Sequence, residues 1–188
     1  MTQEHIILYR LLGEALVYPD KNTVTRLQQI VGEIGLDMLN DSQWPLASFI
    51  HELGELARLP LDQVQGEYTR LFINAYPHVP CPPYESAYRE GALLGQAAES
   101  VDVFFRQWGV VMDSEQVDHA GAELEFMAFL LTLGTPDALA AADAFMAEHP
   151  LAWLPRFADD IAGTSHLEFY RATGRLLAAV LQKQPALS

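Results

Sequence analysis

The sequence predicts an all-α protein, a single compact helical domain of about nine helices over residues 1–188. Apolar residues recur at the three- and four-residue spacing of amphipathic helices along nearly the whole chain, and no segment alternates apolar and polar residues as a half-buried strand does. Half of the 188 residues are hydrophobic. The chain can therefore bury its own core, in one domain or, as an alternative, in two lobes.

Four helices are expected before residue 73. Their ranges are 5–17, ended by Pro19; 23–34, for which Asn22 is a suitable cap; 45–58; and a helix after Pro60 that carries Leu61, Val64, Tyr68, Leu71 and Phe72. The three- and four-residue steps along this last helix place its large side chains on one face.

A loop is expected over residues 73–85, where four prolines interrupt the helical pattern: Pro77, Pro80, Pro82 and Pro83. Proline donates no backbone hydrogen bond and biases the preceding residue towards extended conformations. Because prolines also stiffen a loop, the side chains that follow are held in place before any ligand binds.

Five helices are expected in the second half of the chain. They are a long helix over about 86–109, a very apolar helix from Asp118 to Leu133 with a central position, a helix that starts at Pro136, and helices over 151–161 and 166–182. The segment 109–118 is a candidate hinge for exchange of helices between chains, so both a monomer and a helix-swapped dimer stay open.

The chain carries 25 acidic and 11 basic residues, a formal net charge of −14. Such a charge repels nucleic acid and anionic lipid and attracts cationic partners such as a basic peptide, although it also serves solubility. The first five residues lack the positive charge of a secretory signal, and no run approaches about 18 apolar residues. A single cysteine excludes an intramolecular disulfide, so we expect a cytoplasmic protein without a membrane segment.

Motifs for catalysis and for metal binding are incomplete. Residues 51–55 (HELGE) follow the zinc-protease pattern but lack its second histidine, so a solvated helix face is the simpler interpretation. The glycine loops that bind nucleotide phosphates are absent. Cys81 lies between two prolines, and only His78 is near enough in sequence to activate a thiol. We therefore expect no enzyme activity, no metal and no cofactor.

Asp118, His119 and Glu123 form the most informative polar group. Asp118 is suited to cap the helix that it precedes, and His119 and Glu123 are four residues apart on one face. The group is either a cap with a local pair or an acidic, hydrogen-bonding lip on a pocket.

Three sequence blocks, taken in order, resemble the signature of the TorD/DmsD/NarJ family of cytoplasmic chaperones for molybdenum-containing oxidoreductases. They are EYTRLF at 67–72, PPYESAY at 82–88 and DHAGAELEFM at 118–127. The closing segments EHPLAWLPRFADDI and HLEFYRATGRLLAAVL also look like the last helical pair of that family.

This resemblance implies an all-helical domain that binds the twin-arginine signal peptide of an apo-reductase and delays its export until the molybdenum cofactor is inserted. The positions that match the binding surface of the family are Tyr68, Leu71, Phe72, Pro83, Tyr84, Ser86, Tyr88, Asp118 and His119. The aromatic and apolar members would contact the apolar run of the signal peptide, while Asp118 and Glu123 would face its arginines. The identity of the client reductase stays open.

Two other classes of function compete with this one. The resemblance also allows weak binding or hydrolysis of guanine nucleotide, although the chain has no phosphate-binding loop. A structural subunit of an oxidoreductase would need haem-attachment or iron–sulfur cysteines, which the sequence does not have.

Overall fold

The computed structural model describes residues 2–35, 39, 45–112 and 117–183, and within these ranges it contains ten α-helices and one π-helical turn. Their bounds are α1 (Thr2–Ala15), α2 (Thr23–Val31), α4 (Leu46–Leu56), α5 (Leu61–Tyr68), η1 (Thr69–Ile73), α6 (Glu85–Glu90), α7 (Gln96–Gln107), α8 (Ala120–Leu133), α9 (Pro136–Glu148), α10 (Pro150–Thr164) and α11 (Glu168–Gln182). The only extended pairing in these ranges is an isolated bridge between Tyr84 and His119. The predicted all-α fold is therefore confirmed, with one helix more than expected.

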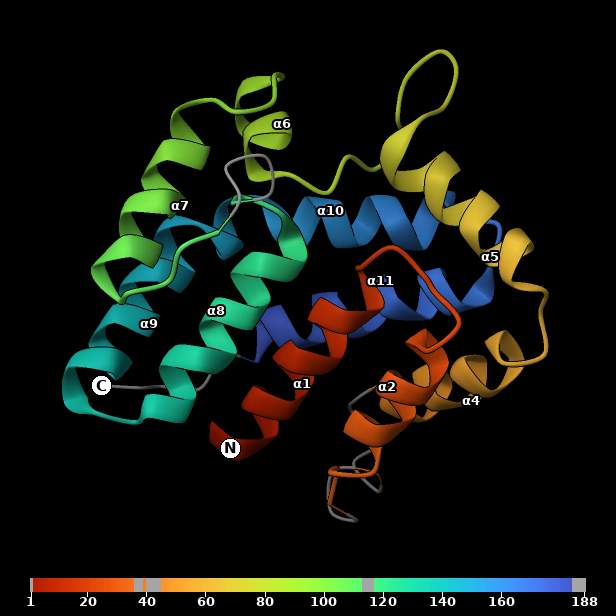
Figure 1. The fold of residues 1–188 in the computed structure, drawn as a ribbon, viewed down its shortest axis with the longest axis horizontal. Helices are drawn as coiled ribbons and strands as arrows, with labels where there is room; N and C mark the ends of the chain where they lie inside the picture. Colours follow the sequence, from red (N-terminus) through yellow and green to blue (C-terminus); the bar gives the residue numbers. More distant parts are fainter. Residues whose placement is uncertain (1, 36–38, 40–44, 113–116, 184–188) are drawn as a thin grey trace.

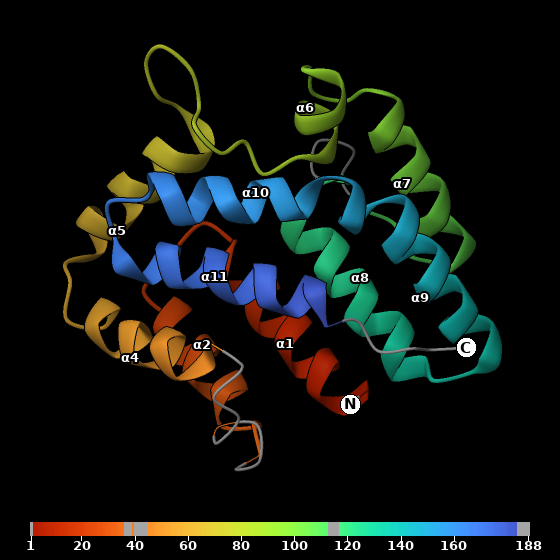
Figure 2. The same cartoon turned by 180° about the vertical axis from the view of Figure 1, so that it is seen from behind.

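Two helix pairs form the centre of the fold (Figures 1 and 2), and the first of them joins the helical groups on either side of the proline-rich loop. Helix α1 of the first group lies along α8, and α10 lies along α11. Helices α2, α4 and α5 lie on one side of these pairs, and α6, α7 and α9 lie on the other. Among the described helices, none is both long enough and apolar enough to cross a bilayer.

Small residues allow these helix pairs to approach closely. A Cβ atom on Gly174 of α11 would lie 2.5 Å from the carbonyl oxygen of Ala158 on α10. At the other pair, a Cβ on Gly13 of α1 would lie 3.3 Å from the carbonyl oxygen of Gly121, and one on Gly121 would lie 3.2 Å from that of Gly13. Only glycine leaves room for the backbones at these crossings.

The long helix expected over 86–109 is a wrong prediction, because the chain breaks into α6 and α7. Gly91 ends α6 with a φ of 72°, and Leu94 also has a positive φ of 59°. The carboxylate of Glu90 then accepts hydrogen bonds from the backbone N–H groups of Gln96 and Ala97, at 2.9 and 2.7 Å. Glu90 thus caps α7, and an acidic group at a helix N-terminus is stabilising.

The helix expected to run to Phe72 does so, but its last turn is π-helical. The backbone N–H of Asn74 donates to the carbonyl oxygen of Thr69 at 2.8 Å, which is the five-residue step of a π-helix. Most other helix ends lie within a few residues of the predicted ones. Asn22 occupies the N-cap of α2, as expected, but its side chain makes no capping hydrogen bond.

The expected hinge over 109–118 falls partly outside the described residues, which exclude 113–116. Gly109, with a φ of 73°, follows the end of α7. The exchange of helices between chains stays a prediction.

Candidate functional site

Two long-range backbone contacts hold the proline-rich loop against the start of α8. The N–H of Ala120 donates to the carbonyl oxygen of Pro83 at 2.9 Å, and the N–H of Glu85 donates to that of Asp118 at 3.0 Å. Earlier in the loop, the N–H of Cys81 donates to the carbonyl oxygen of Leu71 at 2.9 Å. The loop is therefore fixed on both sides of Tyr84.

An aromatic pocket of about 290 Å³ lies beneath this loop. Five residues that the sequence assigned to a binding surface line it: Tyr68, Phe72, Pro83, Tyr84 and His119. The remaining lining residues are Val17, Tyr18, Ile73, Met112, Gly121, Ala122 and Glu125. The pocket thus joins the end of α1, the π-helical turn, the loop and the first turns of α8, and we call it the aromatic pocket below.

One wall of the aromatic pocket is a stack of rings. Tyr68 contacts Phe72 at a centroid distance of 4.7 Å and meets Tyr18 edge-on at 5.3 Å. The hydroxyl of Tyr68 donates to the carbonyl oxygen of Leu16 at 2.8 Å, and burial raises its pKa well above the usual value. Tyr18 and Ile73 are exposed, which leaves apolar surface at the rim of the pocket. Such a wall suits an apolar side chain of a ligand.

His119 is a neutral hydrogen-bonding group. Its Nδ1 accepts from the backbone N–H of Gly121 at 3.0 Å, which caps α8 and places the proton of the neutral ring on Nε2. Burial lowers the pKa of His119 to about 4, so the ring is uncharged at neutral pH. Tyr84 meets this ring edge-on at a centroid distance of 5.4 Å.

Asp118 and Ser86 do not line the pocket, and their expected role as contacts for a ligand stays a prediction. Asp118 is 1% exposed, and its Oδ2 accepts from the backbone N–H of Ser86 at 2.8 Å. The carboxylate therefore caps α6 rather than α8, where the sequence placed it, and His119 caps α8 instead. Within the described residues, the other carboxylate oxygen of Asp118 and the Ser86 hydroxyl are buried without a hydrogen-bond partner.

Glu123 is also misplaced by the sequence prediction, since its side chain is fully buried and cannot form an acidic lip. The indole N–H of Trp153 donates to its carboxyl group, at 3.1 Å to Oε2. Burial and the adjacent Glu85 carboxylate raise the pKa of Glu123 well above its usual range, which favours its protonated form.

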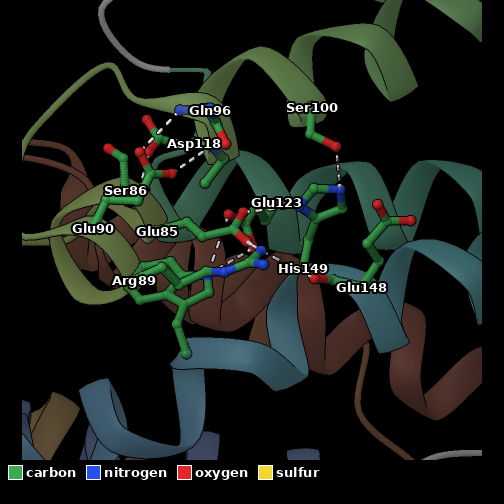
Figure 3. A network of polar contacts seen from close by, with 12 residues as sticks. Glu85, Ser86, Arg89, Glu90, Gln96, Ser100, Asp118, Glu123, Glu148 and His149 are labelled. Atoms are coloured by element: carbon green, nitrogen blue, oxygen red, sulfur yellow. Dashed lines mark hydrogen bonds and ion pairs between the residues drawn. The ribbon is translucent and has the colours of Figure 1, made fainter.

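Glu123 belongs to a buried polar network that holds α6 in place (Figure 3). The carboxylate of Glu85 accepts from Arg89 one turn later, and His149 Nδ1 lies 2.9 Å from Glu85 Oε2. His149 also faces the hydroxyl of Ser100 on α7 through Nε2, at 3.4 Å. Because the network joins α6 to α7, to α8 and to the junction of α9 and α10, it fixes the direction in which the loop enters α6.

Tyr88 and Leu71 lie behind or beside the pocket rather than on its wall. The hydroxyl of Tyr88 donates to Asp160 at 2.9 Å, and its ring packs against Trp153 and Phe157. Leu71 is fully buried. Tyr88 therefore anchors α6 to α10.

Cys81 is a buried thiol. Burial and the nearby Asp160 carboxylate raise its pKa to about 12, so it stays protonated and is a poor nucleophile.

The sequence did not single out Glu125, Tyr18 or Met112. Glu125 is the acidic side chain in the pocket lining, and it makes no hydrogen bond or ion pair within the part of the chain that the structure describes. Partial desolvation and the Glu14 carboxylate raise its pKa. The available sequence clue was helical spacing, because Glu125 lies one turn after Gly121 and Ala122 on α8.

The sequence model described as nitrate reductase delta subunit matches residues 38–159. Chaperone protein TorD of Photobacterium profundum is 27% identical over 167 residues, which cover 81% of this chain and 77% of that protein. Chaperone protein TorD of Vibrio vulnificus is 27% identical over 156 residues, 74% of this chain and 72% of that one.

A similar fold is found in the crystal structure of a proposed redox enzyme maturation protein from Archaeoglobus fulgidus. The TM-score is 0.69 at 26% sequence identity, and the superposition covers 96% of this chain and 94% of the other. These findings agree with the resemblance carried by the three signature blocks. The protein therefore belongs to the nitrate reductase delta subunit family, which is the TorD/NarJ family.

Proposed function

We propose that this protein is a cytoplasmic maturation chaperone for a molybdenum-containing oxidoreductase, and that its aromatic pocket binds the twin-arginine signal peptide of the apo-enzyme. Its relatives named TorD are chaperones, and the neighbouring structure is described as a redox enzyme maturation protein. Binding would mask the signal peptide and leave the precursor open for cofactor insertion.

One observation carries the assignment to this pocket. Residues from all three signature blocks, which are far apart in the sequence, line the same pocket: Tyr68 and Phe72, then Pro83 and Tyr84, then His119. Their chemistry suits a peptide with an apolar run, because rings with polar tips bury apolar area and still offer hydrogen bonds.

The charges around the pocket favour a cationic ligand over a nucleotide. Among the described residues, no lysine or arginine lines it, and His119 is neutral there. A triphosphate would meet Glu125 and no positive charge, whereas a leader with two arginines complements a chain of net charge −14.

The test is a calorimetric titration with a synthetic leader peptide that has two adjacent arginines followed by a leucine- and alanine-rich run. Tyr84→Ala should weaken binding about tenfold, because a ring in the wall of the pocket is lost. Tyr76→Ala is the matched control, since Tyr76 lies on the same loop but is 100% exposed. The proposal fails if the peptide does not bind, or if both variants bind equally well. Hydrolysis of guanine nucleotide above a blank would favour the enzymatic alternative.

A further inference from the structure

The aromatic pocket is the first of three hollows that follow one another between α1 and α8. The second, of about 470 Å³, shares Glu125 with it and is also lined by Glu14 and Phe129. The third, of about 640 Å³, shares Arg10 and Thr132 with the second. Because consecutive hollows have lining residues in common, they lie next to one another along the helix pair, and we call the three together the seam groove.

The spacing of the lining residues explains why the groove follows the two helices. On α1 and just beyond its end, the lining positions are Gln3, Ile6, Arg10, Glu14 and Val17. On α8 they include Gly121, Glu125, Ala128 and Thr132. Steps of three and four residues mark a single face of each helix. From Gly121 to Thr132 the groove spans about 16 Å, enough for about three turns of a bound helix.

The groove contains one unmatched charge. Arg10 donates two hydrogen bonds to Glu33, at 2.6 and 3.1 Å, and Glu14 accepts one from Arg26 at 2.6 Å. Glu125 has no such partner within the described residues, although it lies where the first two hollows meet. A guanidinium group placed there would gain a charge-assisted hydrogen bond that nothing within the described part of the protein supplies.

The rest of the groove combines apolar side chains with the paired charges of Arg10 and Glu14. Ile30 and Phe129 line the second hollow, and Ile6 and Leu131 line the third. A ligand with a cation followed by an apolar run therefore matches the order of the hollows, since the charge lies at Glu125 and the apolar surface extends beyond it.

We propose that the seam groove is the binding surface for the leader beyond the aromatic pocket, with Glu125 as the residue that recognises an arginine of the leader. This inference rests on the proposed function and refines it. Asp118 and Glu123, which the sequence assigned to this task, are buried in the support of α6. Glu125 is the carboxylate that remains accessible at the pocket.

A charge-neutral substitution tests the role of Glu125. Glu125→Gln keeps the size of the side chain and should weaken binding of the two-arginine peptide about five- to tenfold, as expected for the loss of a partly exposed charge-assisted hydrogen bond. Glu52→Gln on α4, outside the groove, is the control with the same charge change. A peptide with glutamines in place of both arginines should bind wild type and Glu125→Gln alike.

Blocking the far end of the groove tests its length. Thr132→Trp would fill the junction of the second and third hollows and should weaken binding at least threefold, whereas Leu133→Trp, at the next exposed position, should not. Far-ultraviolet circular dichroism would verify that all variants are folded. If wild type binds the peptide but Glu125→Gln and Thr132→Trp bind as tightly as their controls, the proposal for the seam groove is wrong, while the proposal for the aromatic pocket is not contradicted. If wild type binds no leader, both proposals fall.

Discussion

The backbone N–H of Ser86 donates to the carboxylate of Asp118 at 2.8 Å, and this contact joins the start of α6 to the residue before the cap of α8. Two residues that a sequence comparison would assign to ligand contact are thus paired with each other. Tyr84, which lies in the pocket wall, is held between this contact and the hydrogen bond from Ala120 to Pro83. We therefore expect Asp118 to affect a ligand in the aromatic pocket by positioning Tyr84.

Two substitutions of Asp118 distinguish positioning from direct contact. Asp118→Ala removes the cap of α6 and should cost about 1–2 kcal/mol of unfolding free energy, with weaker binding of the leader peptide. Asp118→Asn retains an oxygen that can accept the hydrogen bond from the Ser86 N–H. It should therefore keep most of the stability and most of the affinity for the leader peptide. Urea unfolding and calorimetry measure the two effects. If Asn loses as much affinity as Ala while the protein stays as stable as wild type, Asp118 contacts the arginine directly.

Glu123 should tolerate replacement by its neutral isostere. Because its raised pKa favours the protonated form in the folded protein, Glu123→Gln should change the unfolding free energy by less than about 1 kcal/mol near pH 4.5 and should be more stable than wild type at neutral pH. Glu123→Ala should cost about 2–4 kcal/mol, because it creates a cavity and leaves the Trp153 indole N–H without a partner.

The pH dependence of unfolding provides a second test of Glu123. A folded pKa above the unfolded value of 4.5 means that stability is lost as the pH rises through the folded pKa. The unfolding free energy of wild type should therefore decrease more on going from pH 5 to pH 8 than that of Glu123→Gln. Equal pH dependence would contradict a protonated Glu123. Fluorescence of Trp153 reports on the same environment.

His119 should have the opposite effect on stability. Its folded pKa of about 4 lies below the ordinary histidine value of 6.5, so between these values the unfolded chain binds a proton that the folded protein excludes. Stability should therefore fall on acidification from pH 6.5 to pH 4, and His119→Gln should lose less over this range. His51→Gln, on the exposed surface of α4, is the control. Titration of the imidazole signals by NMR measures the pKa directly, and a value near 6.5 would be inconsistent with a buried ring.

Two glycine substitutions test the packing of α10 against α11. Gly174→Ala would place a Cβ 2.5 Å from the Ala158 carbonyl oxygen and 2.9 Å from the Ala162 nitrogen, so the helices must separate. We expect a loss of about 3 kcal/mol in urea unfolding. Gly163→Ala on α10 meets no atom within 4 Å and should stabilise the protein by about 0.5–1 kcal/mol. Similar effects of the two variants would mean that the crossing is less close than described.

The helices and the proline-rich loop were predictable because apolar periodicity and proline act locally. The break between α6 and α7 was not, since it depends on Glu90 folding back to the N–H groups of Gln96 and Ala97. Gly91 and Gly95 do not by themselves indicate a break, because two glycines four residues apart also occur within a single helix that packs closely against a neighbour. Sequence spacing alone gives no reason to prefer the broken form.

The pocket was predictable in part. Tyr68, Phe72, Pro83, Tyr84 and His119 came from the signature blocks and line it. The orientation of the acidic residues was harder to predict, because Glu123 and Glu125 are two positions apart and so face opposite sides of α8. One must point inwards and the other outwards, but only the partner on α10, Trp153, decides which.

The walls of the aromatic pocket extend from Val17 to Glu125 along the chain, which has a consequence during translation. A ribosome synthesises these segments in order, and the last wall is delivered only after the start of α8 has left the exit tunnel. We therefore expect the nascent chain to lack a complete aromatic pocket, and so to bind no leader peptide, before that point.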